Sequence, residues 1–123
     1  MASLAQQGAG VRIPKLKCLP LLLLSAPAPG MALEPPSDPL TRVYYELEVA
    51  SYCGLVSSAV HAGFRREAGP IERNVTRERL ERSRMDAWQA AHLEWQNRGL
   101  GGFKRWCRNE GRTAAERFLA VPE

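Results

Sequence analysis

The sequence predicts a small all-α protein, a bundle of three main helices tied together by one disulfide. Apolar residues recur at three- and four-residue spacings in three segments, which is the period of an amphipathic helix. Stretches rich in glycine and proline separate these segments, and none of them shows the strict alternation of a strand. Two cysteines, Cys53 and Cys107, fall in the first and the last segment. A chain of 123 residues suffices for one domain.

Residues 1–32 have the pattern of a secretory signal peptide. A basic section ending at Lys17 precedes an apolar run from Cys18 to Ala26, and Gly30–Ala32 places small side chains where signal peptidase requires them. The apolar run is too short to cross a bilayer, which takes about 20 residues. We therefore expect a mature chain that starts near Leu33 and is periplasmic or secreted. Mitochondrial import is the alternative, because the segment also lacks acids.

The positive charge of the chain lies mostly in this leader. The formal net charge is +4, and residues 1–32 hold three basic residues and no acid. Residues 33–123 hold the other 14 basic residues and all 13 acids, which leaves a net charge of +1. A nucleic-acid-binding domain needs a basic footprint in its folded part. We therefore expect no nucleic-acid partner, and the mature chain has no apolar run long enough to be a transmembrane segment.

A Pro-rich linker is expected over residues 33–39, followed by a single helical domain over residues 40–123. Prolines fix the backbone and remove donors, so the linker should be extended. Asp38 followed by Pro39 favours a helix start, because the carboxylate accepts from free N–H groups and proline at the first position gives up a donor that has no partner.

The first helix is predicted to run over residues 40–69 and to end at Gly69-Pro70. Its centre carries no charge, which indicates burial. Along one side Ala50, Gly54 and Ser58 follow one another at four-residue spacing. Such a row predicts that another helix approaches closely at this side, since glycine otherwise weakens a helix by roughly 1 kcal/mol.

Two further helices follow. The second is predicted to begin at Asn74 or Thr76, both suitable N-caps, and to end at Gly99. The third begins at Phe103, and Gly111 should either kink it or divide it into two shorter helices.

Removal of the leader takes away Cys18 and leaves Cys53 and Cys107. An even number of cysteines in an oxidising compartment predicts one disulfide, here between the first helix and the last. Closing a loop of about 55 residues contributes ~4 kcal/mol on chain-entropy grounds. Two buried free thiols are the alternative. A metal pair is disfavoured, because the two cysteines lack the close spacing of zinc ligands.

The first candidate site is the row of Trp88, His92 and Trp95. Spacings of four and three residues place these side chains on one helix face. This face could bind an aromatic or cationic ligand, or use His92 as a metal ligand. The more ordinary interpretation is a packed core face. The only other histidine, His61, forms no helical ligand pair with His92, so no metal site is predicted.

The second candidate is a face for an anionic partner, such as an acidic protein, a polysaccharide or a phospholipid surface. Acids are interleaved with its basic residues, so a solvated surface is the ordinary interpretation. The face consists of Arg65, Arg66, Arg73, Arg77 and Arg84.

The chain carries no motif of a serine hydrolase elbow, a P-loop, an EF-hand or a zinc protease helix. We therefore expect no enzyme activity and no cofactor. The sequence favours a small exported protein with a binding, protective or accessory role toward an unknown protein or small ligand in the periplasm. The alternatives are a periplasmic stress chaperone or inhibitor, and a metal or small-ligand carrier that uses the Trp88/His92/Trp95 face.

Overall fold

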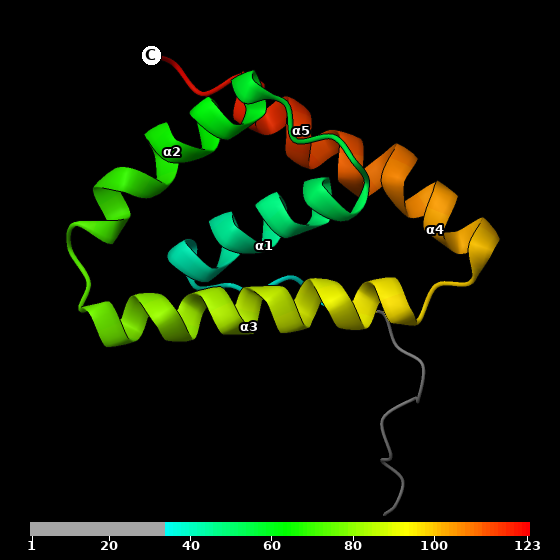
Figure 1. Ribbon diagram of the computed structural model, residues 1–123, viewed down its shortest axis with the longest axis horizontal. Helices are drawn as coiled ribbons and strands as arrows, with labels where there is room; N and C mark the ends of the chain where they lie inside the picture. Colours follow the sequence, from blue (N-terminus) through cyan, green and yellow to red (C-terminus); the bar gives the residue numbers. More distant parts are fainter. Residues whose placement is uncertain (1–33) are drawn as a thin grey trace, which may run out of the picture. The chain divides into compact units, whose positions relative to one another are not determined.

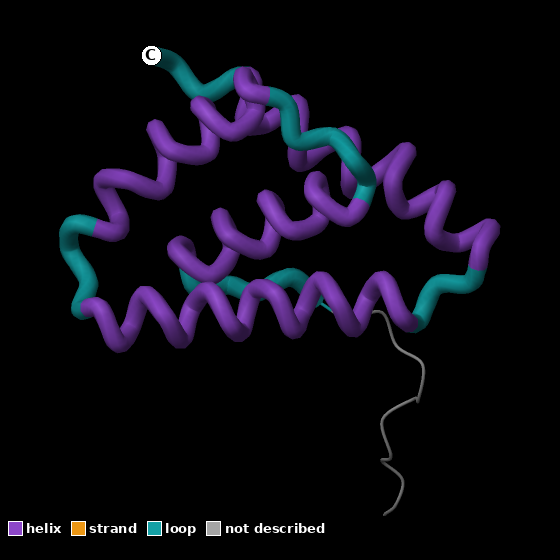
Figure 2. The backbone as a smooth tube through the Cα atoms, viewed as in Figure 1, coloured by secondary structure: helices purple, strands orange, loops and turns teal. Residues whose placement is uncertain are grey.

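A computed structural model describes residues 34–123, which fold into helices joined by short loops (Figures 1 and 2). This part of the chain contains no strand, so the predicted all-α class is confirmed. The predicted leader, residues 1–32, lies outside the described residues. The elements are α1 (Pro39–Tyr52), α2 (Ser58–Glu72), α3 (Arg77–Gln96), α4 (Leu100–Trp106), the π-helical turn η3 (Cys107–Gly111) and α5 (Arg112–Leu119).

Helix α1 is the centre of the fold. It contacts α2, α3, η3 and α5, and Figure 1 shows it enclosed by the other helices. It begins as predicted, because the Asp38 carboxylate accepts from the Thr41 backbone N–H at 3.0 Å and Pro39 takes the first position. A helix that is apolar on most sides is a buried one. The buried side chains of α1 are Leu40, Thr41, Val43, Tyr44, Tyr45, Val49 and Ala50.

The first predicted helix is in fact two helices, and the prediction of one continuous helix was wrong. Gly54 has φ +68°, a left-handed conformation that glycine adopts without strain and that ends helices. Ser57 then caps α2, accepting from the Val60 backbone N–H at 3.1 Å. The turn lets Phe64 of α2 pack into the same core as α1.

The close helix approach lies at Gly63 rather than along the predicted row of Ala50, Gly54 and Ser58. A Cβ atom added to Gly54 would meet nothing within 4 Å. A Cβ atom on Gly63 would overlap the backbone carbonyl of Phe118 in α5. Two helices do approach each other closely at a small residue, but this residue is Gly63 and not a member of the predicted row.

Helix α2 also continues past the predicted stop at Gly69-Pro70. It runs to Glu72, and the Arg73 backbone N–H donates to the Gly69 carbonyl. Proline is tolerated here because the last turn makes tertiary contacts: Ile71 packs against the core, and the Tyr44 hydroxyl of α1 donates to the Glu72 carboxylate.

The second predicted helix is confirmed as α3. Of the two predicted caps, Thr76 is the one used: its hydroxyl accepts from the Arg79 backbone N–H at 3.1 Å. Helix α3 contacts α1, and its buried residues include the small side chains Ser83, Ala87 and Ala91. No helix of residues 34–123 is both long enough and apolar enough to cross a membrane.

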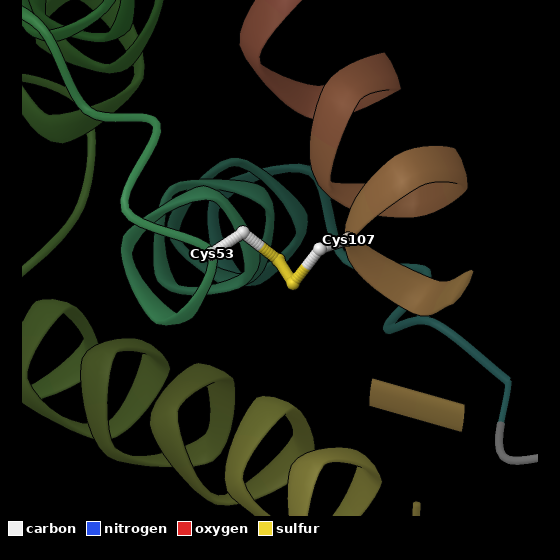
Figure 3. Close-up of a disulfide and its surroundings, with 2 residues drawn as sticks. All are labelled: Cys53 and Cys107. Atoms are coloured by element: carbon white, nitrogen blue, oxygen red, sulfur yellow. A yellow bond between two sulfur atoms is a disulfide. The ribbon is translucent and has the colours of Figure 1, made fainter. Parts of the chain in front are cut away.

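The third predicted segment is helical from Leu100 to Leu119 as α4, η3 and α5. At Gly111, where a kink or two shorter helices were expected, the π-helical turn passes directly into α5. Figure 3 shows Cys53, at the end of α1, bonded to Cys107. The two Cα atoms are 5.3 Å apart, and the predicted disulfide is confirmed. A Cβ atom on Gly111 would lie 2.6 Å from the Cys53 Sγ atom, so only glycine fits beside the bond. Because the described residues form more helical segments than the three predicted, the description as three main helices holds only approximately.

Gly63→Ala should destabilise the protein by about 1–3 kcal/mol, because the added methyl group collides with the backbone of α5. Gly101→Ala is the matched control: nothing lies within 4 Å of its Cβ position in α4, and alanine favours a helix by roughly 1 kcal/mol. Urea unfolding of both variants measures the difference. Equal stability of the two would contradict the close contact between α2 and α5.

Candidate functional site

The three residues predicted to share a face of α3 do so, but two of them are not core. Trp88 is 42% exposed and Trp95 is 40% exposed, and His92 is partly buried between them. The third tryptophan, Trp106, is fully buried. One of the three indoles is thus in the core, and the other two lie at the surface of α3.

These rings form an ordered stack together with Tyr52 of α1. The Trp88 and His92 rings are stacked with centroids 4.8 Å apart, and the Tyr52 and Trp95 rings are stacked at 5.4 Å. The His92 and Trp95 centroids, also 5.4 Å apart, join the two pairs. Such pairs are worth about 0.5–1.5 kcal/mol each beyond their area burial. We call the four residues Tyr52, Trp88, His92 and Trp95 the aromatic ladder.

A hydrogen bond fixes the orientation of the histidine ring. The Tyr52 hydroxyl lies 2.7 Å from the His92 Nδ1 atom. The tautomer sets the direction of this bond: with the ring proton on Nε2 the hydroxyl donates to Nδ1, and with the proton on Nδ1 the ring donates to the hydroxyl. Sequence reasoning missed Tyr52, because it belongs to another helix and no spacing rule links it to α3.

Glu48 lies one turn before Tyr52 on α1 and was also missed. It is partly buried and forms no ion pair with any residue of 34–123. Burial raises the pKa of Glu48 above its ordinary value. The pKa of Tyr52 is also raised, first by burial and then by the negative charge of Glu48. Glu48 and Tyr52 are four residues apart in α1, so their side chains lie on one face of this helix and Glu48 is a neighbour of the ladder.

The structure does not gather the five arginines of the second candidate into one free surface. Arg65 pairs with Glu72, and Arg66 donates to the Val121 carbonyl at 3.0 Å. Arg84 lies over the Tyr44 ring, 5.4 Å from its centroid. Arg73 and Arg77 are exposed. The anionic-partner face stays a prediction, and three of its members make contacts within the fold.

Residues 34–123 contain no candidate metal site. No group of three or more His, Cys, Asp or Glu side chains is placed there to hold an ion. His61 lies on α2 beside Phe64, whereas His92 belongs to the ladder on α3.

Comparisons of the chain with protein families, with curated proteins and with solved structures find no match, and so none of them points to an enzyme family. The candidate site therefore rests on its own geometry and chemistry.

Glu48→Gln should stabilise the protein at pH 7. The folded-state pKa of Glu48 is raised, so its ionised form disfavours the fold above that pKa, and the penalty disappears as pH falls through it. The advantage of the variant should therefore vanish below about pH 4. Thermal unfolding at both pH values measures this. Glu116→Gln is the control, since Glu116 is exposed and unpaired among residues 34–123. A Glu48→Gln variant less stable at pH 7 than the parent would contradict the account.

Proposed function

We propose that this chain is a small exported binding protein and that the aromatic ladder is its binding face. The observation that carries the proposal is the exposure of two tryptophans on α3, each stacked on a ring of the ladder, on a helix that also exposes Met85 and Leu93. Large aromatic side chains are rarely left in water without a use, and tryptophan and tyrosine dominate the energetic centres of binding surfaces.

The ladder is already arranged before any ligand arrives. Stacking holds each indole against a neighbouring ring, and the Tyr52–His92 hydrogen bond holds the centre. A surface whose side chains are fixed in advance loses less conformational entropy on binding. This favours binding of a ligand or partner over a merely tolerated exposure. Among the alternatives, the small-ligand carrier uses this same face, whereas a metal carrier lacks ligands in residues 34–123.

Export is supported by two independent features. Residues 1–32 have the order of a signal peptide, and the predicted cleavage near Leu33 coincides with the start of the compact unit over residues 33–123. The Cys53–Cys107 disulfide fits an oxidising compartment such as the periplasm.

The ladder can be tested with simple probes and the indole N–H signals of the three tryptophans in NMR. Benzyl alcohol represents a neutral aromatic ligand, and N-acetyl-arginine amide represents a cationic one. We expect saturable shifts of the Trp88 and Trp95 signals with at least one probe, while the buried Trp106 signal stays in place as an internal control.

Trp88→Leu should abolish the shift of the Trp95 signal while lowering the unfolding free energy by about 1–2 kcal/mol, because the variant loses the stacking of Trp88 on His92. Absence of saturable shifts with both probes would overturn the proposal.

A further inference from the structure

Among residues 34–123, the carboxylates that are buried or partly buried are paired with arginine in every case but one. Six acids of residues 34–123 are buried or partly buried. Five of them form ion pairs with arginine: Asp38–Arg79, Glu46–Arg117, Glu67–Arg117, Glu72–Arg65 and Glu94–Arg98. The sixth is Glu48, which has no such partner in this part of the chain.

Three of these arginines also cover an aromatic ring. Arg98 pairs with Glu94 at 2.8 Å and lies 5.5 Å from the Trp106 ring centroid. The same arrangement recurs for Arg65 over Phe64 and for Arg117 over Phe118. A carboxylate, a guanidinium and an aromatic face are thus combined three times within the molecule.

Glu48 and the ladder offer the same carboxylate and aromatic face without a described arginine between them. The four cation–π contacts of residues 34–123 involve Tyr44, Phe64, Trp106 and Phe118, and none involves a ladder ring. Yet the indole is the best cation–π acceptor among the side chains.

We propose that the aromatic ladder and Glu48 together bind the guanidinium group of an arginine side chain on a partner polypeptide. This rests on the proposed function and adds the chemistry of the ligand. Glu48 accepts hydrogen bonds from the guanidinium N–H groups, and the plane of the guanidinium stacks on an indole. Arginine suits this pair of contacts better than lysine, because its planar fork matches a carboxylate and stacks on rings.

A partner side chain fits this place better than a free small molecule. Small-molecule sites enclose most of the surface of their ligand in a cavity. Four surface pockets of the described part of the molecule lie elsewhere, since neither Glu48 nor a ladder residue lines any of these four. An open ring face beside a carboxylate is instead suited to a side chain delivered by a second protein surface.

The test compares two peptides that differ only in charge: acetyl-Gly-Arg-Gly-amide and its citrulline counterpart, in which an uncharged ureido group replaces the guanidinium. Each is titrated into the mature protein while the indole N–H signals are recorded. We expect the arginine peptide to shift the Trp88 and Trp95 signals with an affinity about five-fold or more above that of the citrulline peptide. Equal affinity for the two peptides would overturn the inference.

Glu48→Gln should weaken binding of the arginine peptide by a similar factor and leave the benzyl alcohol titration unchanged. Glu116→Gln should change neither. Because Glu48→Gln is expected to fold at least as stably as the parent, its effect cannot come from unfolding. Undiminished arginine binding by Glu48→Gln would sink the inference. Benzyl alcohol binding alone would leave the proposed function standing without it, whereas no shift with any probe would remove both.

Discussion

The bond between Cys53 and Cys107 holds the end of the central helix against the C-terminal segment, and the rest of the structure depends on this tie. The folded part of the chain, residues 34–123, buries only a modest core, so a loop closure worth ~4 kcal/mol is a large share of its stability. Gly111 has no side chain because the Cys53 sulfur occupies that space. The same bond fixes the residue before it, Tyr52, which in turn orders His92 and the ladder.

Arginine side chains join helices of this fold to one another, which the arginine content of the sequence alone does not indicate. Arg117 on α5 pairs with Glu46 of α1 and Glu67 of α2 and so joins three helices. The hydrogen bonds that Arg117 donates to Glu67 and Glu46 raise the pKa of Arg117 against the opposing effect of burial. Seven arginines of residues 34–123 form ion pairs within the molecule. Glu48, a partly buried carboxylate one turn from Tyr52, forms none in this part of the chain, which makes it informative.

The sequence was sufficient to predict the structure where the prediction depends on a local signal. Asp38 with Pro39, and Thr76, each mark a helix start through their own capping chemistry, and the even number of cysteines outside the predicted leader indicates the disulfide. It was insufficient where tertiary contacts decide. Gly54 fits a helix pattern until α2 must turn back over α1, and the contacts of Ile71 and Glu72 carry α2 through Pro70.

The candidate site was predictable only in part, for the same reason. Helical spacing places Trp88, His92 and Trp95 on one face, but it does not say whether that face is core. In the structure the core tryptophan is Trp106 of α4, whereas Trp88 and Trp95 on α3 are partly exposed. Tyr52 and Glu48 reach the ladder only through the packing of α1 on α3, which no spacing along the chain encodes.

The most direct test of the account is the intact mass of the protein recovered from the producing cell, with free thiols blocked before lysis and no reductant added. A disulfide-tied exported protein should start near Leu33, carry no blocking group and weigh two hydrogens less than its reduced form. A chain that retains residues 1–32 and carries blocking groups on both Cys53 and Cys107 would contradict it.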